Sequence, residues 1–138
     1  MIIRDQGHTR RLYRSLSYDS GGTWTIPVKT NYPDGTSKNM SGRLSNGWYY
    51  LINNPKVHGS NLRDPLAISF SRDGWTFEQP LALRKHAPPL RYPGKAKGSH
   101  SFQYSHALEH EGKLWVIYAT NKEDIEISAY PLDSFGLN

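Results

Sequence analysis

The feature that most constrains the fold of this chain is a polar stretch at residues 17–24, Ser-Tyr-Asp-Ser-Gly-Gly-Thr-Trp. Strand-type residues lie on both sides of it. Asp19 can hydrogen-bond the local backbone, and Gly21 and Gly22 accept the positive φ that bulkier residues resist. Trp24 restarts a strand and offers a large apolar ring to pack beneath the turn. The stretch therefore predicts a tight turn between two strands.

A second, shorter copy of this turn lies at residues 71–77. It keeps the Ser, Asp, Gly, Thr and aromatic positions but lacks one residue between Asp73 and Gly74. The two copies start at Ser17 and Ser71, which are 54 positions apart. That spacing is close to one four-stranded blade of a β-propeller. The chain is therefore predicted to repeat a small antiparallel sheet.

The rest of the chain contains many short strand signals and no convincing amphipathic helix. The dipeptide Asn46-Gly47 between two apolar runs is a strong hairpin signal. Turn residues separate the other runs, so the chain is predicted to be all-β. The expected strands are 11–18, 24–28, 41–44, 48–53, 65–71, 76–83, 101–109, 113–120 and 125–130, with loops at 31–39, 54–64 and 85–97.

Composition limits the classes of function. The chain has 138 residues, 36% of them apolar, with 12 Gly and 9 Pro, which suits one domain of short strands. With no cysteine there is no disulfide, thiol nucleophile or thiolate metal ligand. No window approaches the ~18 apolar residues of a membrane span, and residues 1–14 lack the apolar core of a signal peptide. The net charge is +5, but no basic run is interleaved with stacking aromatics, which argues against nucleic acid.

The spacing Ser-x-Asp-x-Gly-x-Thr-Trp at 17–24 is that of the Asp box, and the chain resembles the sialidase (neuraminidase) superfamily, whose propellers carry this turn on the outer rim of each BNR repeat. The resemblance implies an all-β, partial sialidase-like β-propeller of about two to three four-stranded antiparallel blades, in a single domain over residues 1–138. The blades would be half of one, a full one over roughly 37–83, and three strands of a third. We expect a C-terminal portion of a propeller, with the missing blades supplied by upstream sequence or a partner chain.

The resemblance also indicates residues that bind substrate. Such proteins have an Arg shortly before a strand and its Asp box, here Arg63, which corresponds to one of three arginines that hold the substrate carboxylate. A guanidinium suits this role because its planar fork pairs with a carboxylate through two hydrogen bonds and keeps its charge. Arg43 is a second candidate for substrate binding. The expected partner is thus a carbohydrate with a carboxylate.

A tyrosine is the expected nucleophile. Tyr104 precedes a hairpin as in the resembled family, where Tyr replaces the usual carboxylate nucleophile. A phenol with a pKa near 10 needs a base, which the family supplies as a Glu on the next strand. Here Ala119 stands at that position, and Glu123 follows a few residues later. His106 shares the face of Tyr104 if the strand is regular, and could move a proton there. The charges at 122–124 are interpreted as a solvated turn.

These residues predict a sialidase-like, glycan-active protein, an exo-glycosidase that hydrolyses a terminal acidic sugar with Tyr104 and His106 as catalytic residues. The Ala at position 119 favours a second interpretation, a uronate-directed polysaccharide lyase on the same scaffold, with the same pair as base and acid. A third is a non-catalytic carbohydrate-binding propeller. No metal-ligand spacing is present, so neither metal nor cofactor is expected. The compartment is left open, although members of the resembled family are often secreted or periplasmic.

Overall fold

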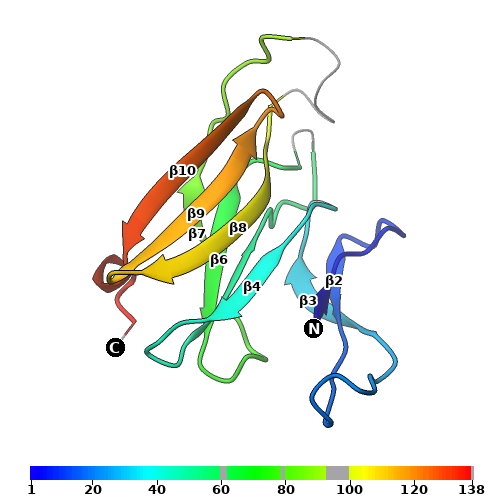
Figure 1. The fold of residues 1–138 in the computed structure, drawn as a ribbon. Helices are drawn as coiled ribbons and strands as arrows, with labels where there is room; N and C mark the ends of the chain where they lie inside the picture. The colour runs from blue at the N-terminus through cyan, green and yellow to red at the C-terminus, as the bar shows by residue number, and fades with distance from the viewer. Residues whose placement is uncertain (60–61, 79, 93–99, 138) are drawn as a thin grey trace.

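A computed structural model describes residues 1–59, 62–78, 80–92 and 100–137. The described chain is all-β and forms three small antiparallel sheets of three, four and three strands (Figure 1). The four-stranded sheet is in the middle, and the other two lie on either side of it. This arrangement confirms the predicted all-β class and is compatible with successive blades of a partial β-propeller. Within the described residues, no helix has the length and hydropathy to cross a membrane.

The first sheet has the order β1-β2-β3 and contains the first Asp box. Its strands are β1 (Ile2–Ile3), β2 (Arg11–Arg14) and β3 (Val28–Pro33). The Asp box connects β2 to β3. The strand β1 was not predicted, because two residues are too few to form a recognisable pattern.

The second sheet has the order β4-β5-β6-β7 and contains the second Asp box. Its strands are β4 (Met40–Arg43), β5 (Tyr49–Asn53), β6 (Leu66–Ser71) and β7 (Leu81–Arg84). Every residue of β6 is buried, as expected for a strand covered on both faces. The Asn-Gly hairpin between β4 and β5 and the strand ending at residue 71 are confirmed.

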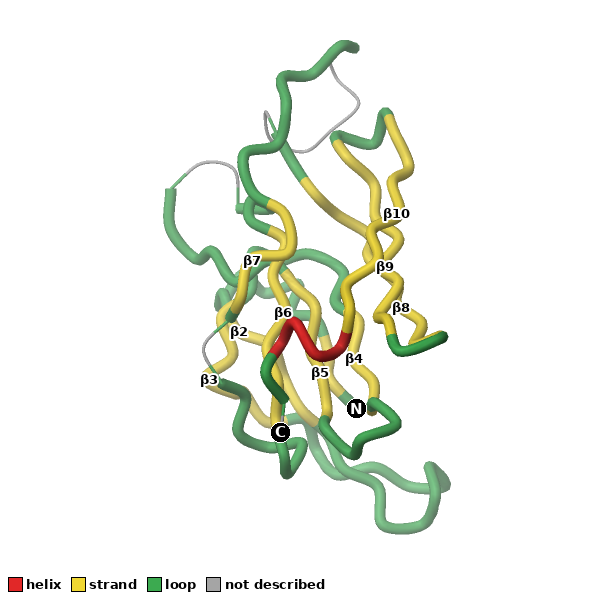
Figure 2. The backbone as a smooth tube through the Cα atoms, turned by 90° about the vertical axis from the view of Figure 1, so that its left-hand side faces the viewer, coloured by secondary structure: helices red, strands yellow, loops and turns green. Residues whose placement is uncertain are grey.

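The third sheet has the order β10-β9-β8. Its strands are β8 (Phe102–His110), β9 (Lys113–Thr120) and β10 (Asp124–Pro131). A single 3-10 turn, Leu132–Phe135, follows β10 and is drawn in red in Figure 2. The predicted hairpin and the last strand are confirmed to within a residue or two at their ends.

Alternate side chains of β5 join the second sheet to both of its neighbours. Tyr50 and Ile52 belong to a large buried cluster that includes Val116 and Tyr118 of β9. Leu51, which points to the opposite face, packs with Leu12 of the first sheet. The core is therefore layered, with sheet stacked on sheet, as in adjacent blades of a propeller.

Both Asp-box turns delay the strand that follows them. The outgoing strands begin at residues 28 and 81, whereas 24 and 76 were predicted. The threonine near the end of each turn is held by the Asp side chain of that turn. Thr23 donates its backbone N–H to Asp19 Oδ1 at 2.8 Å, and Thr76 donates its backbone N–H to Asp73 Oδ1 at 2.8 Å. These backbone groups therefore cannot serve the ladder at the same time.

The predicted loop at 31–39 is wrong over its first three residues. Residues 31–33 complete β3, where Pro33 pairs with Arg11. Gly35 lies two residues after the end of β3. A glycine is needed there because a Cβ would collide with the backbone oxygen and carbon of Leu62. The Pro-Asp-Gly signal thus marks a close approach of two loops.

The two ends of the second sheet carry different connections. Met40 of β4 pairs with Ile52, and the loop before β6 starts from this end of the sheet. At the other end, Arg43 pairs with Tyr49, which pairs with Ser71 at the start of the second Asp box. The loop that carries residue 63 and the Asp-box turn therefore lie at opposite ends of the strands.

Candidate functional site

Arg63 lies in the loop between β5 and β6, at the end away from the Asp box. Its backbone oxygen accepts the N–H of Phe102 at 2.9 Å, which ties the loop to the start of β8. Its guanidinium donates to Gln103 Oε1 and, at 3.4 Å, to the backbone oxygen of Thr36. The side chain is thus held between the second and third sheets.

Tyr104 stands at a bulge in β8. The register with β9 shifts between Gln103 and His106, so two residues of β8 face one residue of β9. Tyr104 has a φ of 58°, the left-handed conformation that a bulky residue adopts only when its surroundings require it. Tyr104 is 43% exposed, and the centroid of its ring is 5.8 Å from Cζ of Arg63. The two residues predicted to act together are therefore neighbours.

Lys122 completes this group from the other side. It lies in the turn between β9 and β10, and its Nζ is 5.6 Å from the centroid of the Tyr104 ring. We call Arg63, Tyr104 and Lys122 the Tyr104 cluster. Two cations from different loops thus approach one phenol, an arrangement that favours a negative charge on or beside the phenol.

The pKa of the Tyr104 phenol is lowered from its usual value. The largest cause is the Arg63 guanidinium, and Lys122 acts in the same direction, while partial desolvation opposes both. Among the described residues, the charged groups that shift this pKa are both cations. The phenolate is therefore stabilised by positive charge and not by a neighbouring base.

Glu123 does not act as the missing base of Tyr104. Its carboxylate accepts the backbone N–H groups of Arg91 at 2.9 Å and Tyr92 at 2.7 Å, and its side chain is 2% exposed. Burial alone would raise the pKa of Glu123, but the hydrogen bonds from Tyr92 and Arg91 lower it overall. Ala119 pairs with Gln103 in the β8–β9 ladder and offers no acid–base group. The loop at Glu123 therefore has a structural role.

His106 is exposed, as Tyr104 is, and buried Ser105 lies between them in β8. The register shift of β8 falls between Gln103 and His106. His106 pairs with Ile117 and lines a hollow of about 350 Å³ together with apolar side chains. These apolar neighbours are Ala107, Leu108, Trp115, Ile117 and Ile127. No contact in the structure joins His106 to Arg63 or Tyr104 within the residues described.

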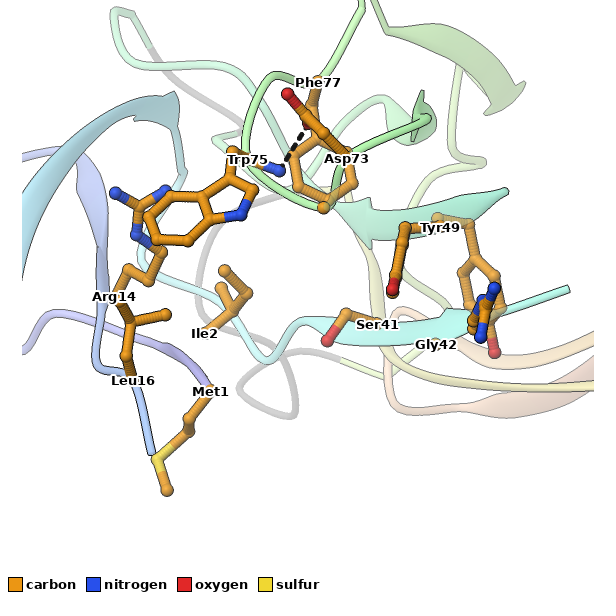
Figure 3. A pocket seen from close by; sticks show the side chains of 13 residues that line it. Met1, Ile2, Arg14, Leu16, Ser41, Gly42, Tyr49, Asp73, Trp75 and Phe77 are labelled. Carbon is orange, nitrogen blue, oxygen red and sulfur yellow. Dashed lines mark hydrogen bonds between the residues drawn. The ribbon is translucent and has the colours of Figure 1, made fainter. Parts of the chain in front are cut away.

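Arg43 is also separate from Arg63, because it lies at the Asp-box end of the second sheet. It lines a groove of about 400 Å³ between the first and second sheets (Figure 3). Its Nε donates to the backbone oxygen of Gly47 at 3.3 Å, and its Cζ is 5.5 Å from the centroid of Tyr49. The two predicted carboxylate-binding arginines are therefore not brought together.

The groove in Figure 3 is closed at one end by a stacked pair. The guanidinium carbon of Arg14 is 4.0 Å from the centroid of Trp75. Among the described residues, the one carboxylate that lines the groove belongs to Asp73, which accepts the backbone N–H groups of Trp75 and Thr76. This carboxylate therefore holds the turn. In the part of the chain that the structure describes, the ring of Tyr49 has one cation over it, Arg43, whereas the ring of Tyr104 has two.

Several residues that shape the Tyr104 cluster were not predicted. Lys122 was interpreted as part of a solvated turn, because a single lysine in the sequence does not show that its side chain approaches Tyr104. Gln103 and Thr36 contact Arg63 but belong to common residue types in unremarkable contexts. The signal that could have found Lys122 is its place two residues after β9 and three residues after position 119, where the Glu was expected. No group of three or more His, Cys, Asp or Glu in the described part of the chain could hold a metal ion.

The stacked antiparallel sheets, two of which carry an Asp-box turn between their last two strands, define a β-propeller-type repeat protein. The sequence matches the BNR repeat-like domain over residues 1–121, and the chain belongs to this sialidase-like family. No curated protein matches the sequence.

Proposed function

We propose that the Tyr104 cluster binds an acidic sugar and that the protein is a sialidase-like glycoside hydrolase. The observation that supports this proposal is the convergence of Arg63 and Lys122 on one phenol. A sugar carboxylate would pair with the guanidinium of Arg63, whose planar fork suits two parallel hydrogen bonds. The sugar ring would then lie over Tyr104.

In this proposal Tyr104 is the nucleophile. Its phenolate oxygen forms a bond to the anomeric carbon, the glycosidic C–O bond breaks, and the leaving oxygen takes a proton from water. Water then hydrolyses the tyrosyl–sugar bond and restores the phenol. The lowered pKa of Tyr104 supports this role because it increases the phenolate fraction at a given pH.

A second candidate function is a lyase reaction on a uronate. The observation that favours it is the all-cationic surrounding of Tyr104, with Glu123 occupied elsewhere. The phenolate would remove the proton next to the carboxylate, Arg63 would neutralise the developing charge, and the bond to the leaving oxygen would break with formation of a C=C bond.

The test compares two products from the same protein. The full chain is incubated with a fluorogenic sialoside, with glucuronide-containing oligosaccharides and with neutral oligosaccharides as controls. Release of free acidic sugar supports hydrolysis, and new ultraviolet absorbance from an unsaturated uronide supports the lyase. Binding to the acidic sugars without either product supports the third interpretation, a carbohydrate-binding propeller.

The variants Tyr104→Phe and Arg63→Met separate the two roles. Tyr104→Phe should abolish turnover and retain binding, because only the hydroxyl is removed. Arg63→Met should weaken binding of acidic sugars by roughly tenfold or more, as expected for loss of a charge-assisted pair. Full turnover by Tyr104→Phe would contradict both catalytic proposals.

A further inference from the structure

We propose that Lys122 is a positioning residue that holds Tyr104 in its reactive phenolate form. It would replace the Glu that serves as the base of the tyrosine in the family that the sequence resembles. This inference rests on the proposed function, because it assigns the group that makes Tyr104 reactive. It concerns a charge–charge effect on the phenol and no direct contact with substrate.

The first argument is the rigidity of the turn that carries Lys122. Asn121 and Lys122 are two consecutive left-handed residues, with φ of 56° and 59°. Asn121 is 1% exposed, exchanges backbone and side-chain hydrogen bonds with Ser101 at 2.8 Å each, and donates from Nδ2 to the backbone oxygen of Pro88 at 2.8 Å. The backbone of the turn is therefore anchored, and the Lys122 side chain starts from a fixed point within reach of the Tyr104 ring.

The second argument is the set of charges around the phenol. Arg63 approaches from the β5–β6 loop and Lys122 from the β9–β10 turn. The acidic neighbours of Lys122 are engaged elsewhere, since Glu123 binds the backbone at Arg91 and Asp124 lies 2.6 Å from the Arg91 guanidinium. On β8, the strand of Tyr104, the nearest titratable group is His106, which lies two residues further along and pairs with Ile117.

The third argument is that a bound carboxylate affects the two cations differently. When a sugar carboxylate pairs with Arg63, it compensates the charge of that guanidinium. The support that Arg63 gives to the phenolate is then reduced. Lys122 does not pair with the sugar carboxylate in this proposal, so it remains the cation that favours the phenolate in the substrate complex. The two cations would therefore act at different steps.

The test measures the titration of Tyr104 directly. The full chain is labelled with ¹³Cζ-tyrosine, and the Tyr104 resonance is identified by its loss in Tyr104→Phe. In Lys122→Met the titration of Tyr104 should move to higher pH, and Lys122→Arg should restore most of the wild-type titration. An unchanged titration in Lys122→Met overturns the inference.

The matched control is Lys113→Met. Lys113 also places its Nζ over an aromatic ring of the same sheet, 5.9 Å from the centroid of Trp115. Its removal should leave the Tyr104 titration unchanged. A shift of equal size in Lys113→Met, or displaced resonances of the other tyrosines in Lys122→Met, would indicate a general structural effect and overturn the specific role.

A kinetic measurement distinguishes this inference from the proposed function. The fold-loss in kcat/KM caused by Lys122→Met should shrink as the pH is raised, since the phenolate forms without the lysine at high pH. A fold-loss that does not change with pH overturns the role. If Tyr104 titrates as expected but no acidic glycan is turned over, the proposed function fails while the assignment of Lys122 stands.

Discussion

The side-chain Nδ2 of Asn54 lies 3.1 Å from the backbone oxygen of Arg63. The same nitrogen is 2.9 Å from the oxygen of Pro65 and 3.1 Å from that of Phe102, and Asn54 is fully buried. One amide thus joins the loop that carries Arg63 to the strand that carries Tyr104. The geometry of the Tyr104 cluster depends on a residue that touches neither side chain.

Substituting Asn54 should destabilise the protein in a graded way. Asn54→Ala removes donors to buried carbonyl oxygens and should cost roughly 2–3 kcal/mol in the free energy of unfolding. Asn54→Asp keeps the shape but directs a carboxylate at three carbonyl oxygens, and should cost more, roughly 3–5 kcal/mol at neutral pH. Urea unfolding measures both. Equal stability of Asn54→Asp and wild type would contradict the assigned hydrogen bonds.

The second Asp box should make stability depend on pH in the acid range. Hydrogen bonds from the backbone N–H groups of Thr76 and Trp75 lower the pKa of Asp73 from 3.8 to about 2. A carboxyl whose pKa is lower in the folded state stabilises the fold above the unfolded pKa, and this contribution is lost as the pH falls from about 4 towards 2. Asp73→Asn should therefore destabilise at neutral pH and approach wild type near pH 2.

The first Asp box supplies an independent control for this effect. The pKa of Asp19 is also lowered to about 2, chiefly by the backbone N–H of Thr23 and then by its hydroxyl. Asp19→Asn should show the same pH pattern, and the double variant should be flatter between pH 2 and 4 than either single one. Urea midpoints that vary with pH equally in wild type and the double variant would contradict both assignments.

A methyl group on Gly35 should disturb the loop next to Arg63. Gly35→Ala places a Cβ against the backbone of Leu62, 2.9 Å from its carbonyl carbon, and overpacking of this kind costs about 1–3 kcal/mol. In Gly7→Ala the new Cβ would meet only the flexible side chain of Asp5 at 3.1 Å, so its unfolding midpoint should change little. If both variants have the same midpoint, the close approach of the two loops is wrong.

The outer face of the third sheet should reduce the solubility of this chain. Leu108, Ile125 and Ile127 are 67%, 78% and 63% exposed, and Trp115 and Ile117 lie between them on the same face. Contiguous exposed apolar groups promote association. Ile125→Lys with Ile127→Lys should raise the monomer fraction in analytical ultracentrifugation while costing about 1 kcal/mol or less. Unchanged association would show that this face is not responsible.

Much of the fold could be predicted because the repeat has local signals. The Asp box combines fixed hydrogen-bonding residues with glycines, and the Asn-Gly hairpin between β4 and β5 is set by its turn. The starts of β3 and β7 were predicted four and five residues too early. Strand propensity continues through the ends of both turns, but the backbone N–H groups of Thr23 and Thr76 are bound by the Asp side chains and cannot join the ladder.

The site could be predicted only in part, because it depends on contacts between distant segments. Arg63 and Tyr104 are adjacent as the motif implied, whereas Arg43 lies at the opposite end of the second sheet. The sequence around Tyr104 gives no sign of the bulge in β8 or of the left-handed conformation of Tyr104. The position of Lys122 depends on Asn121, whose anchoring partners are 20 and more residues away.

The Tyr104 cluster also follows from the order of strands in each sheet. The Asp box comes after β2 and after β6, so β1–β2 corresponds to β5–β6, and by the same order to β9–β10. Each of these three connections carries a cation at one end of the sheets: Arg10, which donates to Thr36 Oγ1 at 3.0 Å, then Arg63, then Lys122. The Asp-box turns at the opposite end can stay unchanged. One end of the repeat is thus free to vary its chemistry while the other preserves the architecture.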